Sequence, residues 1–262
     1  MLGAIIGDVA GSLYEFSSPK TKDFLFFPAG AGLTDDSIMT LAIGCACADS
    51  VLEDEADFKA SCVYYMRLLG RQYPYAGYGG MFAQWLDSDS LPAYNSYGNG
   101  SAMRVSPVAW VAQSLEEAER LARWSAEVTH NHPEGIKGAQ AVAGCIYLAR
   151  EGKSKEEIKA YVEEKYYVLD KTVDEIRPGY RFDVTCQGSV PQAIQCFLEA
   201  EDLEDAVRNA VSLGGDGDTQ GAMAGAIAEA FFGVPEELAE QVFSFFDETQ
   251  KEYYLKFTEC LE

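Results

Sequence analysis

Apolar residues recur at the three- and four-residue spacing of an α-helix along most of this 262-residue chain. The pattern predicts helices over 37–52, 56–69, 115–128, 136–149, 155–166, 190–199, 204–212, 219–232 and 236–257. Alternation of apolar and polar residues, which is typical of strands, is scarce. No linker rich in Pro, Gly or Ser divides the chain. The sequence therefore predicts an all-α fold, with a single compact multi-helix domain over 1–262.

Local signals mark several helix ends. Pro133 follows "THNH" and suits the first position of a helix, where its missing N–H costs no hydrogen bond. Ser154 and Glu157 have the spacing of a capping box, which makes Gly152 the stop signal of the preceding helix. The segments predicted to be irregular are 16–34, 72–101 and 167–189. Loops of this length are often binding segments.

The charge balance disfavours polyanionic partners. The chain has 42 Asp and Glu against 20 Lys and Arg, a net charge of −22. Such a surface repels anionic membranes and the phosphate backbone, so nucleic acid is expected at most as a modified substrate.

The cysteines and the N-terminal segment point to the cytoplasm. Seven cysteines include no CxxC pair and most have apolar neighbours, as reduced core thiols do. The N-terminal segment lacks a basic region and has Asp8 where a signal peptide would be apolar, and no apolar run approaches the roughly 20 residues of a membrane span. We expect a cytoplasmic protein that does not enter membranes.

Two acidic clusters stand out because each begins a helical pattern. The clusters are "LTDDSIMTLAIG", with Thr34, Asp35 and Asp36, and "GGDGDTQGAM", with Asp216, Asp218 and Thr219. Acids and hydroxyls at a helix start are favourable caps, which explains either cluster alone. Taken together, the clusters also offer hard oxygen ligands for Mg²⁺, Mn²⁺ or Ca²⁺. Both readings stay open at this point.

Two familiar nucleotide and calcium motifs are excluded by spacing. A calcium-binding EF-hand that starts at Asp216 would place Ile227 where a bidentate acid is required. The "GKS" at 152–154 lacks the first glycine of a phosphate-binding P-loop, because that position is Tyr147.

Three further features have a binding interpretation and a structural one. The "GNGSAMR" stretch, Gly98 to Arg104, suits a phosphate cradled by backbone N–H groups, or a simple turn before a helix. His130 and His132 lack partners at zinc spacing, so a ligand-contacting His130 beside a structural His132 competes with two capping or surface imidazoles. Aromatic residues of the middle loop either shape a binding site or pack on the core: Tyr73, Tyr75, Tyr78 and Trp85.

Five stretches in order resemble the ADP-ribosylglycohydrolase family, in its compact bacterial form of the dinitrogenase-reductase-activating type. They are "GAIIGDVAGSLYEF", "LTDDSIMTLAIG", "YGNGSAMRVSPVAW", "THNHPEGIKGAQAVAG" and "GGDGDTQGAMAGAIAEAFFG". The resemblance implies an all-α fold around a centre of two Mg²⁺, with Mn²⁺ as the alternative ion. It implies hydrolysis of the glycosidic bond between ADP-ribose and an acceptor such as an arginine or serine side chain.

The resemblance also assigns roles by motif. The implied metal ligands are Thr34, Asp35, Asp36, Asp216, Asp218, Thr219 and Glu15. The implied substrate-binding residues are Tyr97, Gly98, Asn99, Gly100, Ser101, Met103 and His130. The implied catalytic residues, which include the general base, are Asp35, Asp36 and Glu15. Ser37 and Gly217 depart from hydroxyl residues common in the family, and neither departure removes a carboxylate.

Charge arithmetic fits this assignment. Glu15 and the four aspartates together carry five negative charges, and two divalent cations would leave about −1 at the centre. We therefore expect a Mg²⁺-dependent hydrolase whose substrate is ADP-ribose or an ADP-ribosylated protein. The alternatives are a non-catalytic ADP-ribose-binding or structural relative and a metal-dependent phosphoesterase.

Overall fold

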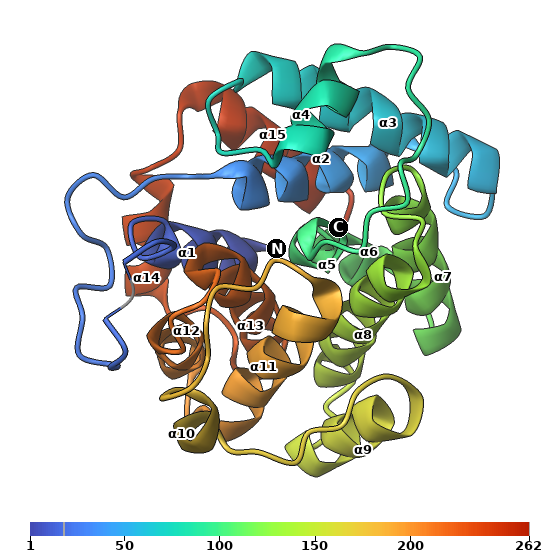
Figure 1. Ribbon diagram of the computed structural model, residues 1–262. Helices are drawn as coiled ribbons and strands as arrows, with labels where there is room; N and C mark the ends of the chain where they lie inside the picture. The colour runs from blue at the N-terminus through green and yellow to red at the C-terminus, as the bar shows by residue number, and fades with distance from the viewer. Residues whose placement is uncertain (18, 262) are drawn as a thin grey trace.

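The computed structural model describes residues 1–17 and 19–261, and these residues form helices joined by loops (Figure 1). The helices are α1 (Leu2–Gly11), α2 (Asp35–Asp49), α3 (Glu55–Gln72), α4 (Gly80–Asp87), α5 (Gly100–Met103), α6 (Ser106–Val111), α7 (Leu115–Glu127), α8 (Pro133–Arg150), α9 (Lys155–Lys165), α10 (Val173–Ile176), α11 (Cys186–Glu199), α12 (Leu203–Ser212), α13 (Gly217–Phe232), α14 (Glu236–Phe243) and α15 (Glu248–Glu259). The only β-pairing in this part of the chain is an isolated bridge between Gly98 and Thr185. The all-α prediction is confirmed.

The predicted helix ranges needed two corrections. The range 236–257 is two helices, because Asp247 starts a new helix with a capping box to Gln250. The pattern also missed α1, α4, α5, α6 and α10, of which α4 and α10 lie in segments predicted to be irregular. Helix α1 has no polar face to reveal its period, because all ten of its residues are buried. The other four have only four to eight residues, too few for periodicity to register.

The helix-end signals read from the sequence are confirmed. Pro133 is the first residue of α8. Ser154 and Glu157 form the capping box of α9. Gly152 has φ +72° and ends α8, with its N–H donating to Ala149 O at 3.1 Å.

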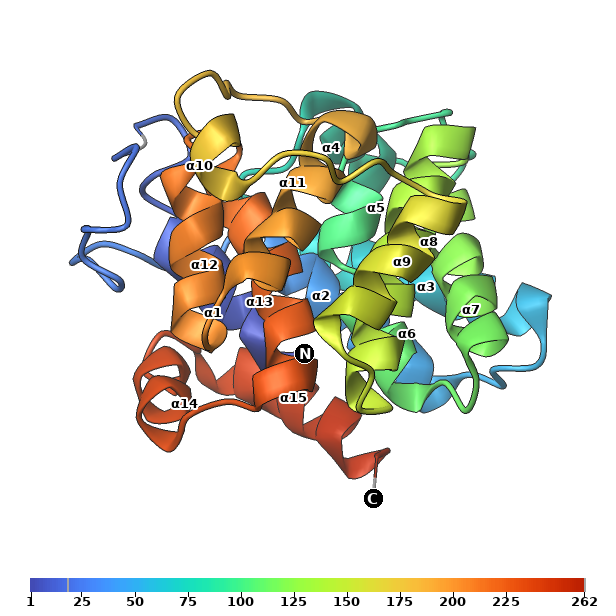
Figure 2. The ribbon, with the colours of Figure 1, turned by 90° about the horizontal axis from the view of Figure 1, so that it is seen from below.

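Helix α13 is the centre of the fold, with α1, α8, α11 and α12 packed around it (Figure 2). Its closest neighbour is α1, which runs antiparallel to it and meets it glycine to glycine. A β-carbon on Gly7 would lie 2.0 Å from Gly221 O, and one on Gly3 would lie 2.2 Å from Gly225 O. Only glycine permits backbones to approach this closely. The contact brings the C-terminal end of α1 to the N-terminal end of α13.

The packing at the opposite end of this helix pair is polar. Glu229 on α13 accepts hydrogen bonds from the N–H groups of Leu2 at 3.1 Å and Gly3 at 2.7 Å. It thereby satisfies donors that the first turn of α1 leaves unpaired. The bonds to Glu229 and the glycine contacts together fix the register of α1 along α13.

One large hydrophobic core contains residues from every long helix, and a smaller cluster lies under α10, α11 and α12. In the part of the chain that the structure describes, none of the helices has the length and apolar character needed to cross a membrane.

Candidate functional site

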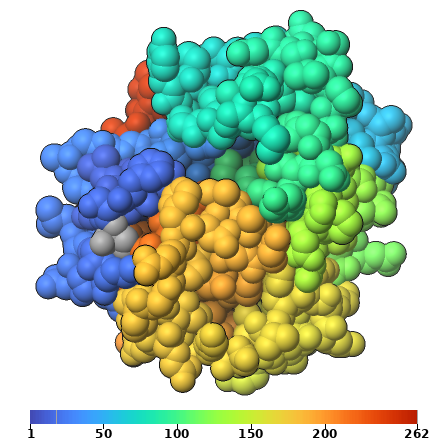
Figure 3. All heavy atoms as spheres, viewed as in Figure 1, coloured from blue at the N-terminus to red at the C-terminus, as the bar shows by residue number. Residues whose placement is uncertain are grey.

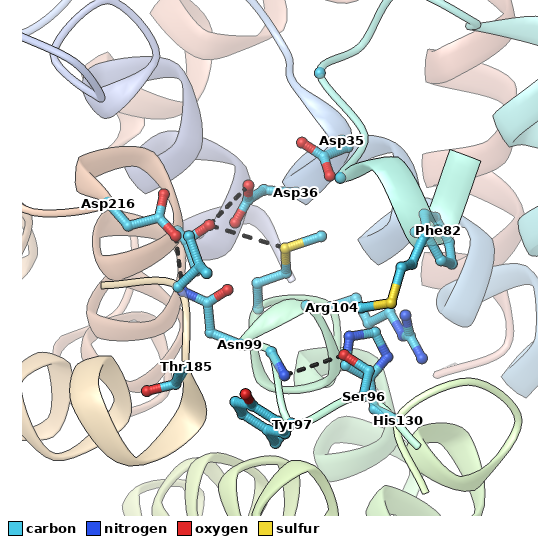
Figure 4. A pocket seen from close by; sticks show the side chains of 18 of the residues that line it. Asp35, Asp36, Phe82, Ser96, Tyr97, Asn99, Arg104, His130, Thr185 and Asp216 are labelled. Atoms are coloured by element: carbon cyan, nitrogen blue, oxygen red, sulfur yellow. Dashed lines mark hydrogen bonds between the residues drawn. The ribbon is translucent and has the colours of Figure 1, made fainter. Parts of the chain in front are cut away.

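A cavity of about 600 Å³ opens where the C-terminal end of α1 meets the N-terminal ends of α2, α5 and α13. The molecular surface is hollowed there, between the segments around residues 77–82 and 94–100 and the segment at 184–185 (Figure 3). Its walls differ in character. Carboxylates occupy one side, and the loop at 94–100 with His130 forms another (Figure 4).

Carboxylates from three separate parts of the chain converge at the acidic side. Oxygen atoms of Asp8, Asp36 and Asp218 lie within 4.8 Å of one another, and so do those of Glu15, Asp216 and Asp218. Asp218 belongs to both groups. Two oxygen triads that share a corner are an arrangement that suits hard divalent cations.

Asp35 belongs to neither triad but lines the same cavity. Its backbone N–H donates to Ala76 O at 2.8 Å, and a β-carbon on Gly77 would lie 3.4 Å from its Oδ1. The Asp35 carboxyl group therefore faces the segment around Gly77, which precedes α4.

Asp8 was missed by the sequence assignment, although it is the most heavily bonded acid of the cluster. It accepts hydrogen bonds from Thr34 N at 2.9 Å, Thr34 Oγ1 at 2.7 Å and Ser37 N at 3.1 Å, and also from the Ser37 hydroxyl. A carboxylate on α1 thus holds the start of α2 in place. The signal was present, since Asp8 is the single charged residue within the apolar run of α1.

The capping interpretation holds for one acidic cluster and fails for the other. Thr34 caps α2, since its Oγ1 accepts from Asp36 N at 3.3 Å. Asp216 stands at the cap position of α13 but makes no capping bond. Its Oδ2 accepts instead from Asn99 Nδ2 at 2.8 Å, and both residues line the cavity (Figure 4). Capping therefore does not explain the second cluster.

The electrostatics of the cluster are unfavourable without a counter-charge. Burial, reinforced by neighbouring carboxylates, raises the pKa of Asp35 to about 7 and that of Glu15 to about 7. Burial raises the pKa of Asp8 to about 6 against the hydrogen bonds it accepts. The pKa values of Asp36 and Asp218 are raised well above the usual range for the same reasons, burial first and repulsion second.

One oxygen in the cluster lacks any partner. Asp36 Oδ2 accepts from Thr219 Oγ1 at 3.2 Å, whereas its Oδ1 is buried and unbonded within the described residues. A buried carboxylate oxygen without a donor costs free energy unless a cation is bound there. The donor set of carboxylates and hydroxyls therefore fits a Mg²⁺-like ion.

The loop opposite the carboxylates is held by backbone pairing. Asn99 N donates to Val184 O at 2.8 Å, and Cys186 N donates to Tyr97 O at 2.9 Å. Tyr97, Gly98, Asn99, Gly100 and Met103 all line the cavity. Ser101 lies behind them, because its hydroxyl donates to Gly135 O at 2.7 Å. Its side chain supports the loop and does not face the cavity.

The ADP-ribosylglycohydrolase family model matches residues 1–259. The chain belongs to this family. The mouse (Mus musculus) protein named ADP-ribosylhydrolase ARH3 is 27% identical, over 95% of this chain and 87% of that protein. A Pseudomonas putida protein named ADP-ribosylarginine hydrolase Tri1 is 26% identical, over 92% of this chain and 72% of that protein.

The fold itself is found in a solved structure. The chain superposes on one described as an ADP-ribosylglycohydrolase-related protein complex with a TM-score of 0.62 and 21% identity, covering 100% of this chain and 97% of that one. At this identity the match concerns the fold alone.

This member of the ADP-ribosylglycohydrolase family accommodates both of its departures from the common motif. The Ser37 hydroxyl donates to Asp8, so a serine here retains a hydroxyl bond within the site. A β-carbon on Gly217 would have Tyr14 as its nearest neighbour, at 3.8 Å, an ordinary contact. The glycine is therefore not required by space at that position.

The two histidines occupy different positions, and contact of His130 with a ligand stays a prediction. His132 Nδ1 accepts from Glu134 N at 3.1 Å and caps α8. His130 is buried, with 6% of its surface exposed, and lines the cavity. Burial and the nearby Arg104 hold the pKa of His130 well below its usual value, so its imidazole is neutral.

The aromatic residues considered for the middle loop do not line the cavity. Trp85 is packed in the core and stacks on Phe82, with ring centroids 5.6 Å apart. Tyr75 is 98% exposed. The packing interpretation is the right one for Trp85. Members of the lining that the sequence assignment missed are Gly77, Gly79, Gly80, Met81, Phe82, Tyr94, Asn95, Ser96, Arg104, Val184 and Thr185.

Proposed function

We propose that the protein is a Mg²⁺-dependent hydrolase that cleaves the glycosidic bond between ADP-ribose and an acceptor. The observation that carries the proposal is the pair of carboxylate triads sharing Asp218 at one side of a cavity bounded by a glycine loop. Family membership and the relatives named as ADP-ribosylhydrolases support the reaction class. Residues that would hold two Mg²⁺, or Mn²⁺ in their place, are Asp8, Glu15, Thr34, Asp35, Asp36, Asp216, Asp218 and Thr219.

The chain's own groups supply binding, orientation and proton transfer. The Gly98–Gly100 loop suits the diphosphate, because its glycines let an anion approach the backbone. The N–H groups of Gly98 and Asn99 already donate to Ser96 Oγ and Val184 O, so the Gly100 N–H is the proposed backbone donor of this loop. The distal ribose would then reach the carboxylates. Bound divalent ions polarise oxygen and lower the pKa of water. Glu15, Asp35 and Asp36 line the cavity where a water must be deprotonated, and one of them is the proposed base.

The acceptor is proposed to be a protein side chain, with arginine and serine as the first candidates. The name of the Pseudomonas putida relative specifies ADP-ribosylarginine. A panel of acceptors joined to ADP-ribose through arginine, serine, acetate and nucleic acid distinguishes the linkages. The seven cysteines, six buried and one exposed with none in a disulfide, suit a reducing compartment, so we propose the cytoplasm as the location.

The direct test is release of free ADP-ribose from an ADP-ribosylated protein, with Mg²⁺ and with excess EDTA. We expect release with Mg²⁺ and none with EDTA, and recovery when Mg²⁺ is restored. Undiminished release in EDTA contradicts the metal role. AMP or phosphate among the products indicates a phosphoesterase instead. ADP-ribose binding by calorimetry without turnover of any linkage indicates a non-catalytic relative.

The stabilisation of the fold by Mg²⁺ is expected to grow as pH rises. Asp8, Glu15 and Asp35 have pKa values near 6, 7 and 7 in the folded protein, above their ordinary values of 3.8, 4.5 and 3.8. The folded state therefore binds these protons more tightly than the unfolded state. Without metal, the stability this contributes is complete below about pH 4 and is lost as pH rises through about 7.

Mg²⁺ competes with those protons, so it relieves the loss. The difference in Tm between Mg²⁺ and EDTA should increase from about pH 5 to about pH 8. Differential scanning fluorimetry at matched ionic strength measures it, with Na⁺ as the control. A difference that is constant or shrinks over this range contradicts the carboxylate site.

A further inference from the structure

Arg104 is a buried guanidinium in the wall of the cavity. It follows α5, is 1% exposed, and has no carboxylate partner among the described ion pairs. Its hydrogen bonds go to neutral oxygens, Ser125 O at 3.1 Å and Thr129 Oγ1 at 2.7 Å. Burying a guanidinium without a carboxylate partner costs free energy.

The bond to Thr129 determines where a proton lies. Thr129 Oγ1 is 2.8 Å from His130 Nδ1, and Thr129 is fully buried. Arg104 can only donate, so Thr129 Oγ1 must accept from it. If His130 Nδ1 also donated, the Thr129 proton would have no acceptor in the described part of the site. The Thr129 hydroxyl therefore donates to His130 Nδ1.

The consequence is the tautomer of His130. With Nδ1 accepting and the imidazole neutral, the ring proton lies on Nε2. That nitrogen faces the glycine loop, since β-carbons on Gly98 and Gly100 would lie 3.5 Å and 3.2 Å from it. A carboxylate in place of Thr129 would instead draw the proton to Nδ1 and leave Nε2 an acceptor, which a phosphate oxygen repels.

We propose that Arg104 and Thr129 are positioning residues that fix His130 as an Nε2–H donor to an anionic oxygen bound at the glycine loop. Figure 4 shows Arg104 and His130 together on the side of the cavity away from Asp216. The identity of the anion as the diphosphate of an ADP-ribosyl group rests on the proposed function. The direction of the Arg104–Thr129–His130 hydrogen bonds does not depend on the proposed function.

The first experiment requires no change to these three residues. Long-range ¹H–¹⁵N NMR on the full chain reports the tautomer of each histidine, and the chain has only two. His132→Asn removes one signal and keeps a side chain suited to capping, which assigns the other. We expect His130 in the Nε2–H form. The Nδ1–H form overturns the proposal.

The second experiment compares Thr129→Val, which keeps the shape and loses the hydroxyl, with Thr129→Ser, which keeps the hydroxyl. We expect Thr129→Val to disturb the His130 tautomer and to weaken ADP-ribose binding about tenfold by calorimetry, as loss of a charge-assisted hydrogen bond does. Thr129→Ser should restore both. An unchanged tautomer in Thr129→Val, or a changed tautomer with unchanged affinity, contradicts the positioning role. Failure of the unaltered protein to bind ADP-ribose contradicts the proposed function instead, and the tautomer measurement stands apart from it.

Discussion

Replacing Asp216 and Asp218 by alanine together is expected to abolish ADP-ribose release, with a loss of about 10⁴-fold or more, while the protein stays folded. Asp218 belongs to both carboxylate triads, so its loss breaks both. About 5 kcal/mol of transition-state stabilisation by bound ions corresponds to a loss of this size. The fold should tolerate the change, because burial raises the pKa of both carboxyls and alanine removes that unfavourable burial.

Two measurements separate the loss of activity from the loss of metal binding. ADP-ribose release from an ADP-ribosylated protein reports activity, and the Mg²⁺-dependent increase in Tm reports metal binding, which should also disappear. Asp54→Ala is the matched control. Asp54 caps α3 by accepting from Ala56 N at 2.9 Å and is not among the cavity residues, so its loss should cost about 1 kcal/mol of stability without a loss of turnover. Appreciable turnover by the double variant contradicts the two-triad site.

The sequence predicted those parts of the molecule that are encoded locally. Helical period, the Ser154 capping box and the Gly152 stop depend on residues a few positions apart, and all three are confirmed. The break at Asp247 was equally local, but a continuous apolar pattern concealed it. Hydrophobic periodicity does not reveal a helix that has no exposed face, as in α1.

The site was predictable only through its paired motifs, because its geometry depends on distant packing. No spacing in the sequence reveals that Asn99 donates to Asp216, which is 117 positions away. Nor does it reveal that Asp8 bonds to Thr34 and Ser37. In the sequence, Arg104 is only the last residue of the glycine-containing stretch. Its proposed role in positioning His130 follows from its bond to Thr129, to which the sequence assigned no role.

The contact between α1 and α13 accounts for much of this distant organisation, because both helices carry carboxylates of the site. A glycine inside an exposed helix is usually improved by alanine, by up to about 1 kcal/mol. Gly7→Ala is expected to do the opposite. The new β-carbon would lie 2.0 Å from Gly221 O, a backbone atom that no rotamer change can move.

The helices must therefore separate, and we expect Gly7→Ala to lower the free energy of unfolding by about 3 kcal/mol, near the upper end of what overpacking usually costs. Separation also moves Asp8 away from Asp218, so the variant should lose Mg²⁺-induced stabilisation and turnover at temperatures where it remains folded. Chemical denaturation measures the loss of stability, and Tm with and without Mg²⁺ measures the loss of the response to Mg²⁺.

Gly179→Ala is the control, since a β-carbon there meets nothing within 4 Å. If Gly7→Ala is as stable as the control, close backbone contact does not set the distance between the carboxylates. If it is destabilised but keeps its full response to Mg²⁺, the two triads do not depend on the register of α1 against α13.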